Sequence, residues 1–373
     1  MALSTIPFSG LGADASNQGV NFRNLIINGD MSIAQRSTSV TGSTSSGYLT
    51  VDRWNFARVG GATFSHSQTT DVPTGQGFAN SYKIESTTGD GAMGASELNS
   101  LAHYFEAQNL NSLKWGTGSA ESVTLSFWVK ATVTGTYIVE FYNNDNSGDQ
   151  LSASYTINSA NTWEKKTITV IGYTSGAFGN DNDTGMQINW WLGAGSDFQS
   201  GSLTGTWRTY ADGNRAVGQV NTFENNNNTF YLTGVQLEVG TSASDFEFLP
   251  YDVNLQRCQR YYFEINPNGA NGGPVYPART NGGFDVQNIG IDCPVPLRIG
   301  NPSITIQSGT IMQVWANTFS QTSAGGGSVT GLVDTGSNSN RLMVNTNGFS
   351  GLTGNISAVW GPILQSMPVD AEL

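Results

Sequence analysis

The chain has 373 residues, of which only 12% are charged while 11% are aromatic and 46 are Gly. Its 28 acidic residues outnumber the 16 basic ones, and the net charge of −12 disfavours nucleic-acid binding through a basic patch. The aromatic content excludes a disordered chain, and the scarcity of Lys and Arg disfavours long amphipathic helices. Short strands joined by polar turns fit this composition best.

Residues 1–21 are rich in Gly, Ser and Ala and hold too little apolar surface to fold alone. They lack the basic and apolar regions of a signal peptide, and no stretch of the chain approaches the ~18 apolar residues of a membrane span. We therefore expect an N-terminal anchor peptide, held either by another chain or by a groove of its own domain, and no membrane insertion.

From residue 22 to about 251 the apolar residues follow the period of β-strands. Alternation over 123–129 places Val123, Leu125, Phe127 and Val129 on one face. Further strands are expected at 24–27, 136–142, 154–157, 166–171, 186–191 and 229–239, the last with a bulge at Gly234. The polar stretches 38–47 and 196–228 are expected to be loops. The pattern predicts a jelly-roll β-sandwich over 22–251.

Residues 252–263 differ from the strands before them. Asp252 can cap a short helix that places Leu255, Cys258 and Tyr262 on one side, so a hinge helix is expected. From residue 264 the composition shifts again, with no Lys and with strands expected at 283–291, 303–307, 311–316, 342–345 and 355–359. A smaller C-terminal β-sandwich over 264–373 completes an all-β chain.

Several segments, in this order and spacing, resemble a family of bacteriophage virion proteins. They are RNLIINGDM (23–31), AQR (34–36), DRW (52–54), LSFWVK (125–130), VQLEVG (235–240), EFLPY (247–251) and CQRYY (258–262), with a looser likeness through PLR (296–298), NPS (301–303) and DAEL (370–373). The family consists of short tail-fibre or fibre-like chains whose jelly roll is similar to carbohydrate-binding modules.

This resemblance implies a structural protein on the exterior of a virion, made in the host cytoplasm. It would be a homotrimer, joined to tail or capsid proteins through its N-terminal peptide, and a receptor-binding protein that attaches the particle to host surface polysaccharide. Two alternatives stay open. One is a capsid decoration or tail-tip protein that binds no glycan, and the other is a tail-associated glycan hydrolase.

Catalytic motifs are missing from the sequence. His66 and His103 lie in neither a nucleophile elbow nor a zinc motif. Glycoside hydrolysis needs two facing carboxylates, and the sequence cannot place any pair of its acidic residues at such a separation. We therefore expect no enzyme activity.

Two loops, 143–149 and 181–183, carry the oxygen donors that Ca²⁺ prefers. The EF-hand pattern fails, because the twelfth position from Asp181 is Leu192. The resemblance to carbohydrate-binding modules implies a structural calcium held by an acidic residue just before the closing strand, where this chain has Thr233 and Gly234. A calcium is therefore not supported by that motif, and no other cofactor or metal is expected.

Sugar binding uses exposed aromatic faces beside amide or carboxylate groups. Trp54, Phe127 and Trp128 are expected in the core. The candidate carbohydrate-binding residues lie at strand ends or in polar loops, where a large ring is harder to bury: Trp115, Tyr142, Trp191, Trp207 and Tyr210. The alternative for each is packing on its own loop or on a neighbouring subunit.

Overall fold

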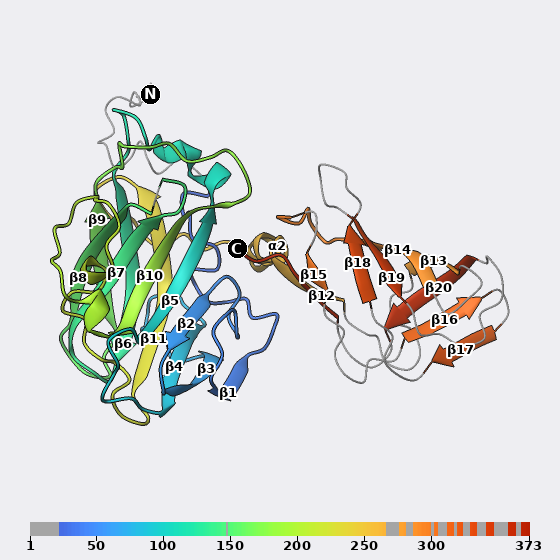
Figure 1. Cartoon of the computed structure of the whole chain (residues 1–373), viewed down its shortest axis with the longest axis horizontal. Coiled ribbons are helices and arrows are strands. Elements are labelled where there is room, and N and C mark those ends of the chain that lie inside the picture. Colours follow the sequence, from blue (N-terminus) through green and yellow to red (C-terminus); the bar gives the residue numbers. More distant parts are fainter. Residues whose placement is uncertain are drawn as a thin grey trace, which may run out of the picture. The chain divides into compact units, whose positions relative to one another are not determined.

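The computed structural model describes residues 22–146, 148–265, 276–280, 286–299, 302–304, 312–316, 319–323, 329–333, 341–346, 357–362 and 367–373. The chain divides into two compact units, Met1–Ser32 with Thr38–Leu249, and Ile33–Ser37 with Pro250–Leu373. Nearly all regular structure is β, as expected (Figure 1). The expected anchor peptide, residues 1–21, lies outside the described residues.

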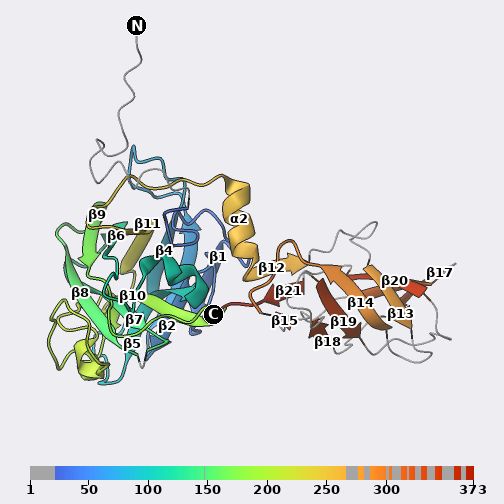
Figure 2. The same ribbon diagram turned by 90° about the horizontal axis from the view of Figure 1, so that it is seen from above.

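The first unit is a sandwich of two antiparallel sheets. The six-stranded sheet has the order β1 (Ser39–Ser43), β3 (Thr63–Thr69), β4 (Ser81–Thr88), β11 (Thr229–Val239), β6 (Val123–Ala131), β9 (Glu164–Val170). The five-stranded sheet has the order β2 (Asn55–Val59), β5 (Leu98–Glu106), β10 (Thr184–Ala194), β7 (Gly135–Asn143), β8 (Gln150–Ile157). Strands distant in sequence are neighbours in both sheets, as in a jelly roll. Figure 2 shows the two sheets as two layers.

The core fills the space between the two sheets. All four alternating residues of β6 predicted to share a face are fully buried, which confirms that prediction: Val123, Leu125, Phe127 and Val129. From the opposite sheet, Ile188 and Trp190 of β10 point inward, and Trp190 lies 5.3 Å from the ring of Trp54. Burying one such side chain contributes roughly 1.5–3 kcal/mol. Because side chains alternate along a strand, the other residues of β10 project from the outer side of the sheet.

Three expectations for this unit are corrected and one is confirmed. Trp128, expected in the core, lies between the buried Phe127 and Val129, so its half-buried side chain projects from the outer side of the six-stranded sheet. Residues 24–27 form no strand, because the side chain of Asn24 accepts the backbone N–H groups of Ile26 and Leu237 at 3.0 Å and so replaces ladder bonds. The expected loop 38–47 contains the edge strand β1, which pairs with β3 from Ser39. The bulge at Gly234 is present, with φ +60° and a register shift against β6.

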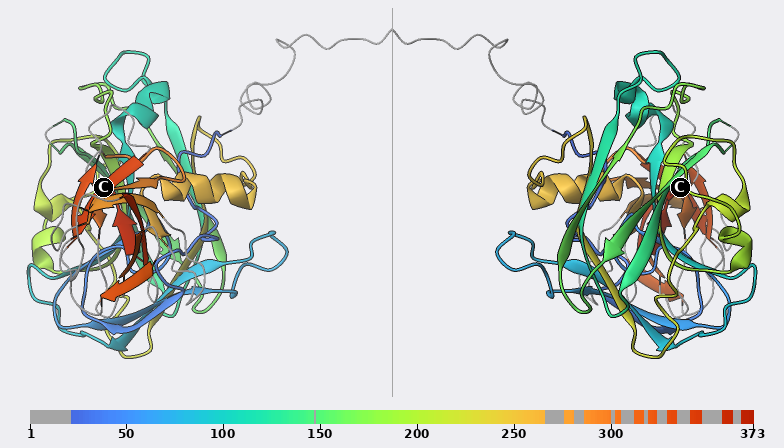
Figure 3. Two further views of the ribbon diagram at one scale, coloured as in Figure 1. Left: turned by 90° about the vertical axis from the view of Figure 1, so that its right-hand side faces the viewer. Right: turned by 90° about the vertical axis from the view of Figure 1, so that its left-hand side faces the viewer.

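Short 3₁₀ helices interrupt the connections of the sandwich: η2 (Ala107–Leu113), η3 (Ser196–Phe198) and η4 (Asp212–Asn214). The last two belong to the polar stretch 196–228, which is otherwise irregular as expected. In Figure 2 this yellow-green stretch lies on the outer side of the five-stranded sheet, near β7 and β8. Both views of Figure 3 show its short helices at the periphery of the sandwich.

The second unit starts with α2 (Tyr251–Gln259). Asp252 lies in the first turn of this helix and does not cap it, because the helix already begins after Pro250. Tyr262 lies in β12 (Tyr262–Ile265) and not on the helix, which ends at Gln259. β12 pairs with β21 (Met367–Asp370), and β21 pairs with β15 (Ser303–Ile304).

A seven-stranded sheet forms the rest of the second unit. Its order is β17 (Phe319–Ser323), β16 (Met312–Ala316), β20 (Ser357–Pro362), β13 (Tyr276–Thr280), β14 (Val286–Asp292), β19 (Arg341–Thr346), β18 (Val329–Val333). The strands expected at 283–291, 311–316, 342–345 and 355–359 overlap β14, β16, β19 and β20, while β13, β17 and β18 were not expected.

A short segment from the N-terminal part of the chain completes the second unit. Gln35 donates from Nε2 to the Tyr262 carbonyl at 2.8 Å. The Arg36 guanidinium lies 3.7 Å from the centre of the Tyr262 ring and pairs with Asp370 and Glu372 at 3.0 and 3.3 Å. The AQR, CQRYY and DAEL motifs of the sequence therefore meet in one cluster.

Candidate functional site

The outer face of the five-stranded sheet carries polar and aromatic side chains in register. Tyr142 of β7 pairs with Gln187 of β10, which pairs with Tyr104 of β5. Paired strands lie about 4.7–4.9 Å apart and paired residues project from the same face. The side chains of these three residues are half-buried. They form a row that alternates aromatic ring, amide and aromatic ring, which we name the Tyr104–Tyr142 row.

The next row on the same face contains a buried ion pair. Glu140 is fully buried, yet its carboxylate accepts hydrogen bonds from Asn189 Nδ2 at 3.0 Å and Trp191 Nε1 at 3.1 Å. Arg215 adds two more, from Nε at 2.8 Å and Nη2 at 3.1 Å. Bidentate pairing of this kind compensates the loss of water around a buried carboxylate.

The charge of Glu140 also acts on its partner. Desolvation alone would lower the pKa of Arg215, but Glu140, with smaller contributions from Tyr210 and Asp212, outweighs it and raises that pKa. Arg215 lies over three aromatic rings, at 5.0 Å from Trp191, 5.8 Å from Phe198 and 5.5 Å from Tyr210. The guanidinium is therefore fixed in position from two directions, by a carboxylate and by stacked rings.

The stretch 196–220 forms one border of this face. Phe198 and Ala216 pack with Trp191 and Ile138 in a small apolar cluster on the outer side of the sheet. Arg208 exchanges two backbone hydrogen bonds with Gln150 of β8, at 2.8 and 3.0 Å. These contacts hold the stretch against β7 and β8.

Tyr210 extends the row from this border. Its ring meets that of Tyr142 edge-on at 5.6 Å, and its hydroxyl donates to Asp212. Tyr210 is one of the few large apolar side chains exposed on the described surface, at 37%. Three tyrosine rings and the Gln187 amide thus share one partly open face. Rings of this kind pack against the C–H faces of sugars, and amides bond to sugar hydroxyls.

Three of the five predicted sugar-binding residues belong to this region. Tyr142 and Tyr210 lie on the face itself. Trp191 is only 1% exposed, beneath Arg215, so it supports Glu140 and leaves no ring face for a ligand.

The other two predicted residues form a separate aromatic cluster. Trp115, 3% exposed, lies 5.2 Å from Trp207 and 5.5 Å from Phe178, and Tyr173 lies 5.1 Å from Trp207. Trp207 also donates from Nε1 to the Ile171 carbonyl at 2.9 Å. These rings pack against partners from other segments of the same chain, so we leave Trp115, Trp191 and Trp207 out of the proposed face.

Sequence reasoning missed Tyr104, Gln187 and Arg215. The first two alternate with core residues along their strands, and that alternation was a usable signal that they face outward. Their neighbourhood depends on the pairing of β5, β10 and β7, which are far apart in sequence. Arg215 lies in a polar loop where no local pattern pointed to the sheet.

The two loops with calcium-like composition use their carboxylates within the protein. Asp145 accepts the N–H of Gly179 at 2.8 Å, Asp149 accepts the Tyr173 hydroxyl at 2.8 Å, and Asp181 accepts the N–H of Asp183 at 3.0 Å. Within the described ranges, no group of three or more His, Cys, Asp or Glu is arranged to hold a metal. In the same part of the chain, no helix has the length and apolarity needed to cross a bilayer.

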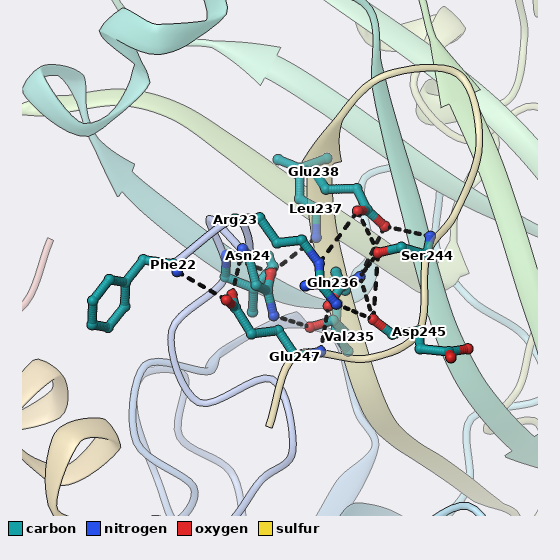
Figure 4. Close-up of polar contacts among 11 residues, drawn as sticks. Phe22, Arg23, Asn24, Val235, Gln236, Leu237, Glu238, Ser244, Asp245 and Glu247 are labelled. Carbon is teal, nitrogen blue, oxygen red and sulfur yellow. Dashed lines mark hydrogen bonds and ion pairs between the residues drawn. The ribbon is translucent and has the colours of Figure 1, made fainter. Parts of the chain in front are cut away.

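A second polar cluster closes the sandwich (Figure 4). The Glu247 carboxylate accepts the backbone N–H groups of Phe22 and Asn24 at 2.8 and 2.9 Å. Glu238 accepts both the N–H and the hydroxyl of Ser244, at 2.8 and 2.6 Å. These groups bond to one another and join the segment before residue 26 to β11 and the turn after it. We interpret these contacts, the Glu247 cluster, as stabilising the fold.

No protein-family model matches this chain, and no curated protein matches it. Among solved structures, the enzymatically active domain of tailspike protein 4 from bacteriophage CBA120 is similar at 14% identity and a TM-score of 0.34, covering 58% of this chain but only 22% of that chain. A family 4 carbohydrate-binding module is similar at 15% identity and a TM-score of 0.29, over 57% of this chain and 98% of that one. The family 11 module of a Clostridium thermocellum cellulosomal cellulase shows 13% identity, a TM-score of 0.29, and coverage of 55% and 98%.

Proposed function

We propose that the sandwich unit binds carbohydrate on the outer face of its five-stranded sheet. The observation that carries this proposal is the Tyr104–Tyr142 row, in which two half-buried tyrosines flank the Gln187 amide and Tyr210 extends the aromatic surface. A pyranose offers an apolar C–H face and a rim of hydroxyls. Rings beside an amide meet both requirements, and the strands hold them in fixed register.

The proposal is binding without hydrolysis. A glycosidase uses one carboxyl group as acid and a second as base or nucleophile. Glu140, the carboxylate beside the row, is fully buried and receives four hydrogen bonds, two of them from Arg215. These hydrogen bonds hold the Glu140 carboxylate within the protein, where it does not point at a ligand on the face.

The wider role that we propose is attachment of a phage particle to host surface glycans, as a tail fibre or receptor-binding protein on the virion exterior. Support comes from the ordered motifs that resemble phage fibre-like chains. A homotrimer would present three such faces, and effective concentration would then raise avidity by roughly 10²–10⁴ over a single site. In this proposal the N-terminal peptide joins the chain to other virion proteins.

The test is glycan-array binding of the full chain followed by titration of any glycan retained. Tyr142→Ala and Gln187→Ala should each weaken binding about tenfold, as expected for the loss of roughly 1–1.5 kcal/mol of stacking or hydrogen bonding. Tyr251→Ala is the matched control, because Tyr251 is 63% exposed and belongs to the second unit.

If the chain retains no glycan on the array, the proposal that it binds carbohydrate is wrong. Together with density for the chain on a capsid lattice, that result would favour a decoration protein. Sugar release from a retained glycan would instead favour a hydrolase.

A further inference from the structure

We propose that the face of the five-stranded sheet selects uncharged glycans and rejects acidic ones. This inference rests on the proposed function and names the class of ligand for the same face. Recognition of an acidic sugar such as a uronate requires a cation that is free to pair with the ligand carboxylate, usually an arginine with its bidentate fork. The face has an arginine, Arg215, but its guanidinium is already paired with the Glu140 carboxylate.

Three charged residues lie together beside the tyrosine row. Arg215 gives its Nε and Nη2 to the two oxygens of Glu140, at 2.8 and 3.1 Å. Its Nη1 lies 3.8 Å from Asp212, whose side chain is 55% exposed. Of the two carboxylates, Glu140 is buried under Arg215, and Asp212 is the one that a ligand can reach.

The cation at the other side of the face is also engaged. Arg53 precedes β2, is fully buried, and donates from Nη2 to the Tyr104 carbonyl at 2.8 Å. Its guanidinium thus supports the strand that carries Tyr104. Arg208, at the border of the face, donates to the Ser202 carbonyl. An incoming carboxylate would meet the exposed Asp212 beside an arginine that is already paired with Glu140, and the chain as a whole carries −12.

Neutral sugars meet no such barrier. With its charge balanced by Glu140, Arg215 still has N–H groups that can donate to hydroxyls, and the tyrosine rings offer stacking. Asp212 is therefore a specificity-determining residue in this account. It repels acidic ligands across the face and keeps the Tyr210 hydroxyl oriented.

The experiment compares an acidic glycan with its carboxyl-reduced, neutral counterpart on the full chain. Each acidic polysaccharide on the array is tested with its reduced form, and any ligand retained is titrated at low and high salt. The neutral form should bind about tenfold more tightly at low salt, and salt should narrow the difference because it screens the repulsion. Asp212→Asn should also reduce the difference in affinity between the two forms, since Asn keeps an acceptor for the Tyr210 hydroxyl and loses the negative charge. Asp252→Asn, which removes an exposed charge from the second unit, is the matched control.

The outcomes separate the two proposals. Acidic glycans that bind as tightly as their reduced forms, or an Asp212→Asn variant with an unchanged ratio, would overturn the charge selection and leave carbohydrate binding intact. If the chain retains neither form of any glycan, both proposals fail together. Both proposals are supported if the chain prefers the neutral forms and the Asp212→Asn variant shows a smaller preference.

Discussion

The guanidinium of Arg215 holds both oxygens of the Glu140 carboxylate, at 2.8 and 3.1 Å, although the two residues are 75 positions apart in the chain. Glu140 comes from a central strand of the sandwich and Arg215 from the stretch that lies over it. The pair therefore joins the scaffold to the border of the proposed binding face. A buried pair stabilises little by itself, but breaking it leaves a charge uncompensated.

Glu140→Ala should lower the free energy of unfolding by about 3–5 kcal/mol, because it leaves the Arg215 guanidinium without its partner. Denaturant unfolding measures this change. Arg215→Ala should give a loss of similar size, and the double variant should cost much less than the sum of the two. If the losses of the two single variants add up in the double variant, Glu140 and Arg215 are not energetically coupled, and the pair does not hold the 196–220 stretch in place.

Trp191→Ala and Trp115→Ala should destabilise the chain by about 3–5 kcal/mol each, because both rings are almost fully buried. Thermal unfolding is the appropriate measurement. The folded fraction of Trp115→Ala should keep its glycan affinity, since that ring belongs to the separate aromatic cluster around Trp207. If the Trp115→Ala variant keeps its stability but loses glycan binding, Trp115 contacts the ligand and the prediction is wrong.

Much of the fold could be predicted from local patterns in the sequence. Alternation at Leu125 and Phe127 gave the buried face of β6, and Gly234 marked the bulge in β11. The motifs that carried the family resemblance have structural roles. Asn28 donates from Nδ2 to the Asp52 carbonyl at 2.9 Å, and Trp54 donates from Nε1 to the Asn28 carbonyl at 3.1 Å.

The binding face could not be predicted in the same way. Tyr104, Gln187 and Tyr142 become neighbours only through the order of β5, β10 and β7, which is a long-range property of the sandwich. Ring size and polar surroundings favoured Trp115 and Trp207, but long-range packing gave those rings partners within the same chain. For the same reason, no local signal placed residues 33–37 in the second unit.

Stability should fall in mild acid because of His66. Burial lowers the pKa of this imidazole from 6.5 to about 4, so below pH 6.5 the unfolded chain takes up a proton that the folded chain does not. The stabilisation is complete above pH 6.5 and is lost as the pH falls toward 4, by about 3 kcal/mol at ~1.36 kcal/mol per pH unit. Denaturant unfolding across this window measures the loss.

The His66→Phe variant provides the comparison, because Phe keeps an aromatic ring beside Phe56 and Phe64 and does not titrate. Its stability should change much less between pH 6.5 and 4. Equal pH dependence in the two proteins would show that other groups cause the loss.

The Glu247 cluster should contribute measurably to the stability of the sandwich. Glu247→Ala leaves the N–H groups of Phe22 and Asn24 without their shared acceptor, and we expect a loss of about 1–3 kcal/mol in the free energy of unfolding. Glu247→Gln keeps one carbonyl acceptor and should lose less. Equal stability of the Ala variant and the unaltered chain would show that water satisfies these groups equally well.

The most direct test of carbohydrate binding at this face is an NMR titration of the labelled chain with a glycan identified on the array. Figure 2 shows the two sheets as separate layers, so the signals of the two outer faces report on different surfaces. The largest shift changes should occur at the Gln187 side-chain amide and the backbone of Tyr142 and Tyr104. If the largest changes instead occur on the six-stranded sheet, at the indole N–H groups of Trp128 and Trp163, the proposed binding face is contradicted.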